Sequence, residues 1–211
     1  MGDNDWTKMF VTKLMKTHKG NCHSLPYFYK ILCNEIDADA SLALAPNHLY
    51  IKHIDEKGQW TNVELTNGGF PRDQWIISQM AISVEAIKNG IYMAPLTEKE
   101  NIVLAMFDLV TCYEYQYGND EFVLSVCNTA LTYFPDFILM LMSKANCIRD
   151  MIKAEKKQQV PNQNFIINHI TLYKKTIERI DDLGYKDMPI ELYQDWVQSI
   201  EDEKIKRGIA P

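Results

Sequence analysis

The chain has no apolar run long enough to cross a bilayer and no strongly basic segment. No stretch of roughly 18 consecutive apolar residues occurs, so we expect no transmembrane helix. The net charge is −6, and the densest basic run, Lys153–Lys157, carries an acid of its own, Glu155. Nucleic acids and anionic membrane surfaces both attract basic patches, so we expect neither as a partner.

The cysteines form neither a disulfide framework nor a metal-binding pattern. There are five of them, an odd number, with no CxxC pair and no metal-ligand spacing: Cys22, Cys33, Cys112, Cys127 and Cys147. The start, Met1–Trp6, has neither the basic region nor the apolar region of a secretory signal. We therefore expect reduced thiols and a cytoplasmic location.

What remains is the composition of an ordinary globular protein. Hydrophobic residues make up 46% of the 211 residues and charged residues 24%. This length suffices for one large domain or two small ones with a real core.

The first segment predicts two helices separated by a break at Lys19–Asn21. Residues 5–17 place apolar side chains near helical spacing, and a second helix is expected from Cys22 to about Ile36. Its predicted apolar stripe consists of Leu25, Phe28, Tyr29, Leu32 and Ile36. Ser24 and Pro26 suit a first helical turn, so Cys22 is expected at or just before the helix N-terminus.

A strand at 40–45 and a hairpin with arms 48–55 and 59–66 follow. The loop 56–58 ends in glycine and suits a three-residue turn, which places Asp55 opposite Gln59. This register pairs Leu49 with Leu65 and Ile51 with Val63 on an apolar face. On the other face Tyr50 pairs with Glu64, and His48 lies diagonal to Glu64, within reach of a long side chain.

The rest of the chain predicts helices, and the pairing of these helices indicates an αα solenoid. Gly90 suits a helix C-cap, and Thr97 with Glu100 forms a capping box. Five helices are expected. The first runs from the capping box at Thr97 to Tyr117, and the others cover about 120–134, 136–156, 162–183 and 189–206. Residues 104–135 resemble a tetratricopeptide repeat, with Gly118 at the interhelix turn, Ala130 as a small residue and Pro135 at the end, although Val110-Thr111 replaces the family's Leu-Gly pair.

Three residues suggest chemistry by their order. Cys22 at a helix N-terminus and next to an imidazolium would ionise readily, and the thiolate is the nucleophile. His48 would act as the base, and Glu64 would hold the imidazole in one orientation. The backbone N–H of Cys22 is a candidate oxyanion donor. A cysteine, histidine or glutamate at any one of these positions is more often structural. The three together, in this order, support the hypothesis of an active site.

These residues belong to segments that resemble the transglutaminase-like superfamily. The resembling residues are Gly20–Leu25, Ala45–His48 and Asn62–Thr66, followed by Gly68 and Gly69, with Trp60 four residues before the carboxylate. The likeness is greatest to the bacterial SirB-type branch, in which this core precedes tetratricopeptide helices and a glutamate is tolerated where transglutaminases usually carry aspartate. The resemblance implies an α+β, papain-like core at 5–72 with a small antiparallel sheet, and an all-α, tetratricopeptide-like region at 73–211. It also implies Cys22 as nucleophile, His48 as base and Glu64 as acid.

Other site residues are weaker candidates. His23, next to Cys22, could be a second base, but adjacent helical residues point about 100° apart. His53 lies on the face of Leu49 and Ile51, and His169 has no acidic or cysteine partner at useful spacing. A zinc site from Cys22, His48 and Glu64 is chemically conceivable.

The expected function is cysteine-dependent acyl transfer at an amide of a protein or peptide, either hydrolysis or transfer to an amine, without a cofactor. The rival reading is a non-catalytic binding or regulatory protein, with a vestigial triad and a peptide-binding solenoid. A third reading is a purely structural domain of a longer chain. Reactivity of Cys22 separates the first reading from the other two.

Overall fold

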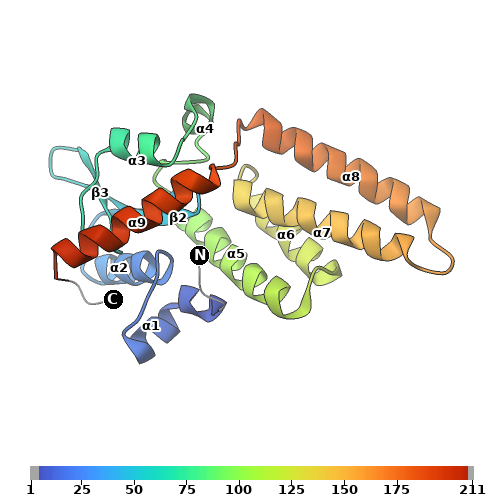
Figure 1. Ribbon diagram of the computed structural model, residues 1–211, viewed down its shortest axis with the longest axis horizontal. Helices are drawn as coiled ribbons and strands as arrows, with labels where there is room; N and C mark the ends of the chain where they lie inside the picture. Colours follow the sequence, from blue (N-terminus) through green and yellow to red (C-terminus); the bar gives the residue numbers. More distant parts are fainter. Residues whose placement is uncertain (1–4, 209–211) are drawn as a thin grey trace. The chain divides into compact units, whose positions relative to one another are not determined.

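The computed structural model describes residues 5–208, which form a mixed α+β protein, mostly helical with a small antiparallel sheet (Figure 1). The expected α+β class and the small antiparallel sheet are confirmed. The elements are a 3-10 helix Trp6–Met9, α1 Val11–Thr17, α2 Ser24–Glu35, β1 Ala40–Ala45, β2 His48–Ile54, β3 Trp60–Val63, α3 Asp73–Gln79, α4 Val84–Lys88, α5 Glu98–Tyr117, α6 Glu121–Tyr133, α7 Ile138–Lys156, α8 Gln163–Asp182 and α9 Ile190–Lys206.

The chain forms two compact units, of which the first is built from two separate segments of the sequence. The first unit combines the residues up to Thr97 with those from Lys186 onward, and the second is Glu98–Tyr185. The first therefore contains the sheet, α1 to α4 and also α9, drawn in red in Figure 1. The boundary expected after residue 72 lies inside this unit, because α3 and α9 contact the sheet and the loop that follows it.

The second hairpin has the register that the turn chemistry predicts. Ile51 pairs with Val63 and Ile54 with Trp60, and the backbone N–H of Asp55 donates to Gln59 O at 2.9 Å. Gly58 has φ +76°, a left-handed conformation that other residues adopt at a cost. The glycine of the predicted loop thus sets which side chains share a face.

The prediction is wrong at the end of this hairpin. β3 stops at Val63, so Leu65 and Glu64 do not pair with Leu49 and Tyr50 in the ladder. Glu64 instead exchanges two backbone hydrogen bonds with Gly69, at 2.8 and 3.0 Å. The chain turns back on itself there, and this tight turn fixes the backbone of the candidate acid.

β1 pairs with β2 through a short turn at Pro46-Asn47, with Asn47 at φ +55°. The sheet order is β1-β2-β3, so β2 is central. Leu49 and Ile51 are buried on one of its faces. His48, Tyr50 and Lys52, on the opposite face, are buried too, which places polar groups in a poorly solvated environment.

α2 is rotated relative to the predicted stripe. Leu32 and Ile36 are 48% and 73% exposed, whereas Cys33 is buried. The side facing the sheet carries Tyr29 and Cys33, and the Tyr29 hydroxyl lies 2.8 Å from His53 Nε2 on β2. α2 packs on β1 and β2, and on this side Tyr29 and Cys33 contact His53.

The second unit consists of α5 to α8, each packed on the next, and these helices lie within a few residues of the predicted ranges. α5 ends before Gly118, at φ +81°, and the Asp120 carboxylate caps α6 by accepting from Phe122 N and Val123 N. Ala130 is fully buried, as a small interhelix residue should be. Within residues 5–208 no helix is both long and apolar enough to span a membrane.

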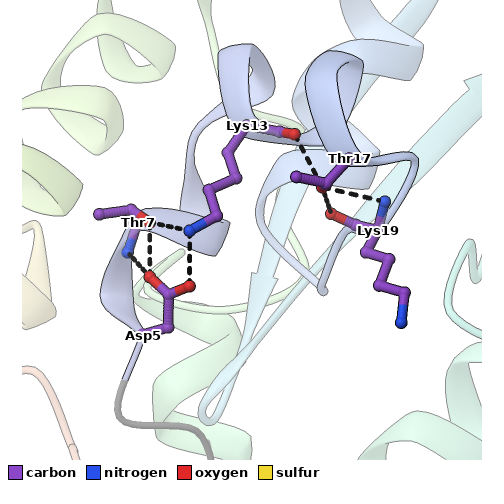
Figure 2. Close-up of polar contacts among 5 residues, drawn as sticks. All are labelled: Asp5, Thr7, Lys13, Thr17 and Lys19. Atoms are coloured by element: carbon purple, nitrogen blue, oxygen red, sulfur yellow. Dashed lines mark hydrogen bonds and ion pairs between the residues drawn. The ribbon is translucent and has the colours of Figure 1, made fainter.

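Polar contacts fix the segment that precedes the candidate nucleophile in the sequence (Figure 2). The Asp5 carboxylate accepts from Thr7 N and from Lys13 Nζ at 2.6 Å, and the hydrogen bonds of Lys13 and Thr7 lower the pKa of Asp5 to about 2. Thr17 Oγ1 donates to Lys13 O at 2.9 Å and contacts the backbone of Lys19. The chain is thereby tied down up to the residue before Gly20.

Candidate functional site

Cys22 lies in a tight capping turn at the N-terminus of α2. The Asn21 side chain accepts from His23 N at 3.0 Å and Ser24 N at 3.1 Å, and Ser24 Oγ accepts from Asn21 N at 3.1 Å. This reciprocal capping satisfies backbone donors that a helix start leaves free. The backbone N–H of Cys22 donates to no described residue. The turn therefore presents both the thiol and a free donor at a helix N-terminus.

Gly20 permits this turn by its lack of a side chain. A Cβ at this position would lie 2.9 Å from Leu25 Cγ and 3.0 Å from both Leu14 Cδ1 and Ser24 Oγ. We expect Gly20→Ala to lower the free energy of unfolding by about 1–3 kcal/mol, because overpacking forces its neighbours to shift. Chemical denaturation measures the change, and Gly58→Ala, whose Cβ would meet nothing, separates crowding from backbone strain. A Gly20→Ala variant as stable as the parent would contradict the prediction.

His48 and Glu64 form a buried ion pair. His48 opens β2, Glu64 follows β3, and His48 Nε2 bonds directly to Glu64 Oε2, with both side chains almost fully enclosed. The second carboxylate oxygen, Oε1, accepts from the backbone N–H of Thr66 at 2.8 Å and from its hydroxyl. Each oxygen of Glu64 thus has a partner, and its orientation toward His48 is determined by the turn.

Cys22 interacts with the other side of the imidazole. Burial opposes ionisation of the thiol, but hydrogen bonding to His48 and the charge of His48 outweigh it, so the pKa of Cys22 lies below its ordinary 9.0. Burial disfavours the imidazolium as well, yet the charge of Glu64 and the bond to Cys22 raise the pKa of His48 from 6.5 to about 10. Nδ1 of His48 is buried and makes no hydrogen bond among residues 5–208, so it is the ring nitrogen that remains available to Cys22.

These opposite shifts move the pair toward thiolate and imidazolium, and Glu64 is ionised at neutral pH. Burial would keep Glu64 neutral, but His48 and then Thr66 lower the pKa of its carboxyl. The pKa of Cys33 is raised by burial, and burial raises those of Cys127 and Cys147 to about 12. Cys22 thus combines a lowered pKa with partial exposure, the properties of a reactive cysteine.

α9 supplies two residues that the sequence did not connect with the site. The ring of Trp196 packs edge-on against His48, with 4.6 Å between centroids, and Trp196 is buried. Tyr193, one turn earlier, lies near enough to Cys22 for the thiolate to contribute, after burial, to raising its pKa. The amphipathic pattern of 189–206 predicts a packed face but not its partner, so no signal in the sequence pointed to these residues.

The remaining candidates lie elsewhere or play smaller parts. His23 is buried next to Cys22, and its charge contributes to lowering the pKa of Cys22. His53 contacts Tyr29 and Cys33 under α2, and His169 bonds Phe165 O within α8. Among the described residues, no group of three or more histidines, cysteines and acids is arranged to hold a metal ion, so the zinc alternative has no geometric support.

A cleft of about 510 Å³ opens on the far side of Glu64. One wall is the segment from Gly69 to Trp75, and the other is the C-terminal half of α9 from Ser199. Arg207 Nη1 joins the two walls by donating to Gly68 O at 2.6 Å. The cleft therefore lies directly beside the acid of the Cys22–His48–Glu64 cluster.

Comparison with protein-family models, curated proteins and solved structures finds no match for this chain. Its own residues and their geometry therefore carry the evidence about its function.

The pH dependence of stability tests the ion pair. A folded thiolate–imidazolium pair would hold one proton on His48, whereas the unfolded chain holds one on Cys22 between pH 6.5 and 9.0, so the contributions of the two groups would cancel. Cys22→Ser removes the thiol and leaves a histidine whose folded pKa is raised by Glu64. Stability from that histidine is fully present below pH 6.5 and is lost as the pH rises toward the folded pKa.

We therefore expect Cys22→Ser to lose about 1.4 kcal/mol of unfolding free energy per pH unit above pH 6.5, relative to the parent chain. Urea denaturation at several pH values measures the slope. The double variant Cys22→Ser/His48→Gln should return to the parent slope. Parallel profiles for the parent and Cys22→Ser would show that His48 is neutral in the folded state.

Proposed function

We propose that the chain is a cysteine-dependent acyl-transfer enzyme that acts on amide bonds through Cys22, His48 and Glu64, within a transglutaminase-like core. The observation that carries this proposal is the buried bond between His48 Nε2 and Glu64 Oε2. Interaction of Cys22 with the same imidazole, which raises the pKa of His48 and lowers that of Cys22, supports it. A thiolate beside an oriented imidazolium is the resting state that such chemistry needs.

In the proposed reaction, the Cys22 thiolate attacks the carbonyl carbon of the amide and forms a tetrahedral intermediate. His48 donates its proton to the leaving nitrogen as the C–N bond breaks, which leaves a thioester on Cys22. Water or a primary amine then attacks the thioester, with neutral His48 accepting the proton. Collapse of this second intermediate releases the acid or the new amide and restores the thiolate–imidazolium pair.

The capping turn supplies one group for the intermediate's oxyanion. The backbone N–H of Cys22 is free of hydrogen bonds to the described residues, whereas those of Asn21, His23 and Ser24 are bound within the turn. A preorganised backbone donor next to the attacking sulfur stabilises charge that develops in the transition state. Glu64 acts through His48, by holding the ring and its charge in place.

An acyl-enzyme trap tests the proposal. A library of glutamine-containing peptides is incubated with the protein, with and without a dansylated primary amine, and quenched in acid for mass spectrometry. We expect a peptide adduct on Cys22 that hydroxylamine removes, with no adduct in Cys22→Ala and a loss of about 100-fold or more in rate in His48→Ala. Turnover unchanged in Cys22→Ala would contradict the mechanism.

A second candidate is a non-catalytic binding protein whose helical unit, proposed as tetratricopeptide-like, holds a peptide. An aromatic cluster on the surface of α5 and α6 favours it: the ring of Tyr113 lies 4.9 Å from Tyr117 and 4.6 Å from Phe122, measured between centroids. Tyr117 and Phe122 are exposed. This candidate predicts no amide turnover, a partner that Cys22→Ala retains, and loss of that partner in Tyr117→Ala.

A further inference from the structure

The cleft beside Glu64 has the composition of a subsite for a peptide side chain. Phe70 and Trp75 line it with 70% and 38% of their surface exposed, and Pro71 lies between them in the chain. Exposed aromatic rings around a concave site are typical of ligand-binding surfaces. At about 510 Å³ the cleft holds one large side chain with its backbone, well short of a whole domain surface.

The charges of the cleft favour an anionic ligand. Two of its three acids are paired with cations, Glu64 with His48 and Glu203 with Arg207 at 2.8 Å. Asp202 accepts a hydrogen bond from the neutral amide of Gln198 at 2.8 Å and keeps its charge. Among its cations, Arg72 makes no ion pair with a described residue. Lys206 reaches Glu203 only at 3.8 Å. Arg72 and Lys206 outnumber the one acid without a cation partner, Asp202, so the remaining charge of the lining is positive in a chain whose net charge is −6.

The position of the cleft relates it to the reaction. Glu64 forms part of its wall, and the imidazole of His48 separates that carboxylate from Cys22. A hydrogen bond on each ring nitrogen would put the sulfur roughly 8 Å from the carboxylate. An extended peptide covers this distance in two to three residues, at about 3.3–3.6 Å each.

We propose that this cleft binds an aromatic side chain of a polypeptide substrate, next to an acidic residue, about two to three residues from the amide that Cys22 attacks. The inference depends on the proposed function for its link to Cys22, but the binding itself does not need turnover. Phe70 and Trp75 contact the aromatic ring, and Arg72 with Lys206 attracts the neighbouring carboxylate.

Binding to the full chain carrying Cys22→Ala tests the proposal without catalysis. The probe is a fluorescein-labelled hexapeptide, Gly-Gln-Gly-Phe-Glu-Gly, measured by fluorescence anisotropy at low salt. We expect saturable binding that weakens at least about tenfold when the peptide's Phe is replaced by Ser, or when Phe70→Ala is added to the protein. Phe70 is highly exposed, so its replacement should leave the fold intact.

A charge swap provides the sharper control. Arg72→Glu should weaken binding of the Glu-containing peptide at least about fivefold and bind a Lys-containing peptide better than the parent chain does. The matched controls are Trp60→Ala, an exposed aromatic of β3 outside the cleft, and Lys88→Glu, an exposed cation of α4. Both should change the affinity less than twofold.

The outcomes separate this inference from the proposed function. Absence of binding, or equal losses in Phe70→Ala and Trp60→Ala, would overturn the subsite even if Cys22 forms acyl-enzymes. Charge-swapped binding in a chain that never forms an acyl-enzyme would support the subsite and remove its catalytic link. Binding that is lost with Phe70→Ala but insensitive to the charge swap would overturn the acidic preference.

Discussion

Iodoacetamide will alkylate Cys22 at least about tenfold faster than any of the other four thiols at pH 6.5. His48 lowers the pKa of Cys22, and burial raises the pKa of Cys33, Cys127 and Cys147. Each unit of lowering gives about tenfold more thiolate but costs about threefold in intrinsic nucleophilicity, a net gain of about threefold. Partial exposure of Cys22 adds to this gain, since those three thiols are buried.

The same experiment in His48→Ala shows the origin of the reactivity. Without the imidazolium, burial of the thiol remains and its pKa rises, so the rate at pH 6.5 should fall about tenfold or more and recover only at alkaline pH. Cys112, which is also partly exposed, is the internal reference and should react at the same rate in both proteins. Equal alkylation rates of Cys22 and Cys112 in the parent chain would contradict the interpretation of Cys22 as an active-site nucleophile. Peptide mapping by mass spectrometry provides the individual rates.

Glu64→Ala will lower the free energy of unfolding by about 3–5 kcal/mol at pH 7. The carboxylate is buried against His48, and removing it takes the hydrogen-bonded counter-charge from Nε2 and leaves only the interaction of His48 with Cys22. His48 then deprotonates or the site opens to water, and either response costs stability. The two hydrogen bonds from Thr66 to Glu64 Oε1 are lost as well.

A double-mutant cycle distinguishes the pair from general damage to the core. His48→Ala/Glu64→Ala should cost at least about 1 kcal/mol less than the sum of the single substitutions, because the double variant leaves no unpaired charge. Glu56→Ala, at an exposed position of the hairpin turn, should stay within about 0.5 kcal/mol of the parent. Strict additivity of His48→Ala and Glu64→Ala would show that the two side chains do not interact. Guanidinium denaturation followed by circular dichroism measures the parent chain and the four variants.

Local rules made the hairpin and the capping turn predictable. A glycine at the third position of a short loop requires a particular turn, and that turn determines the pairs from Ile51–Val63 to Ile54–Trp60. Ser24 and Pro26 predict a helix start by their local preferences, which placed Cys22 at or just before the N-terminus, and α2 begins two residues later at Ser24. The residues that decide these features are within about four positions of each other, so their effect needs no knowledge of the fold.

The same locality explains the errors. The predicted stripe of α2 assumed that its largest apolar residues face the core, but close packing on the sheet selected Cys33 and left Leu32 and Ile36 exposed. The predicted strand ran to Thr66, but the bridge between Glu64 and Gly69 ended it at Val63. Both outcomes depend on which elements meet, which no short segment specifies.

The order and spacing of Cys22, His48 and Glu64 were visible in the sequence, because a turn, a strand start and a strand end are local features. The burial that gives them opposing pKa shifts was not. This burial arises because α9, from the far end of the chain, packs Trp196 on His48. The charges of the buried groups are then stabilised by their partners and not by water. The cleft beside Glu64 has the same origin, since α9 and the segment after β3 must meet to enclose it. Desolvation depends on every atom packed around a group, so only the tertiary structure could decide it.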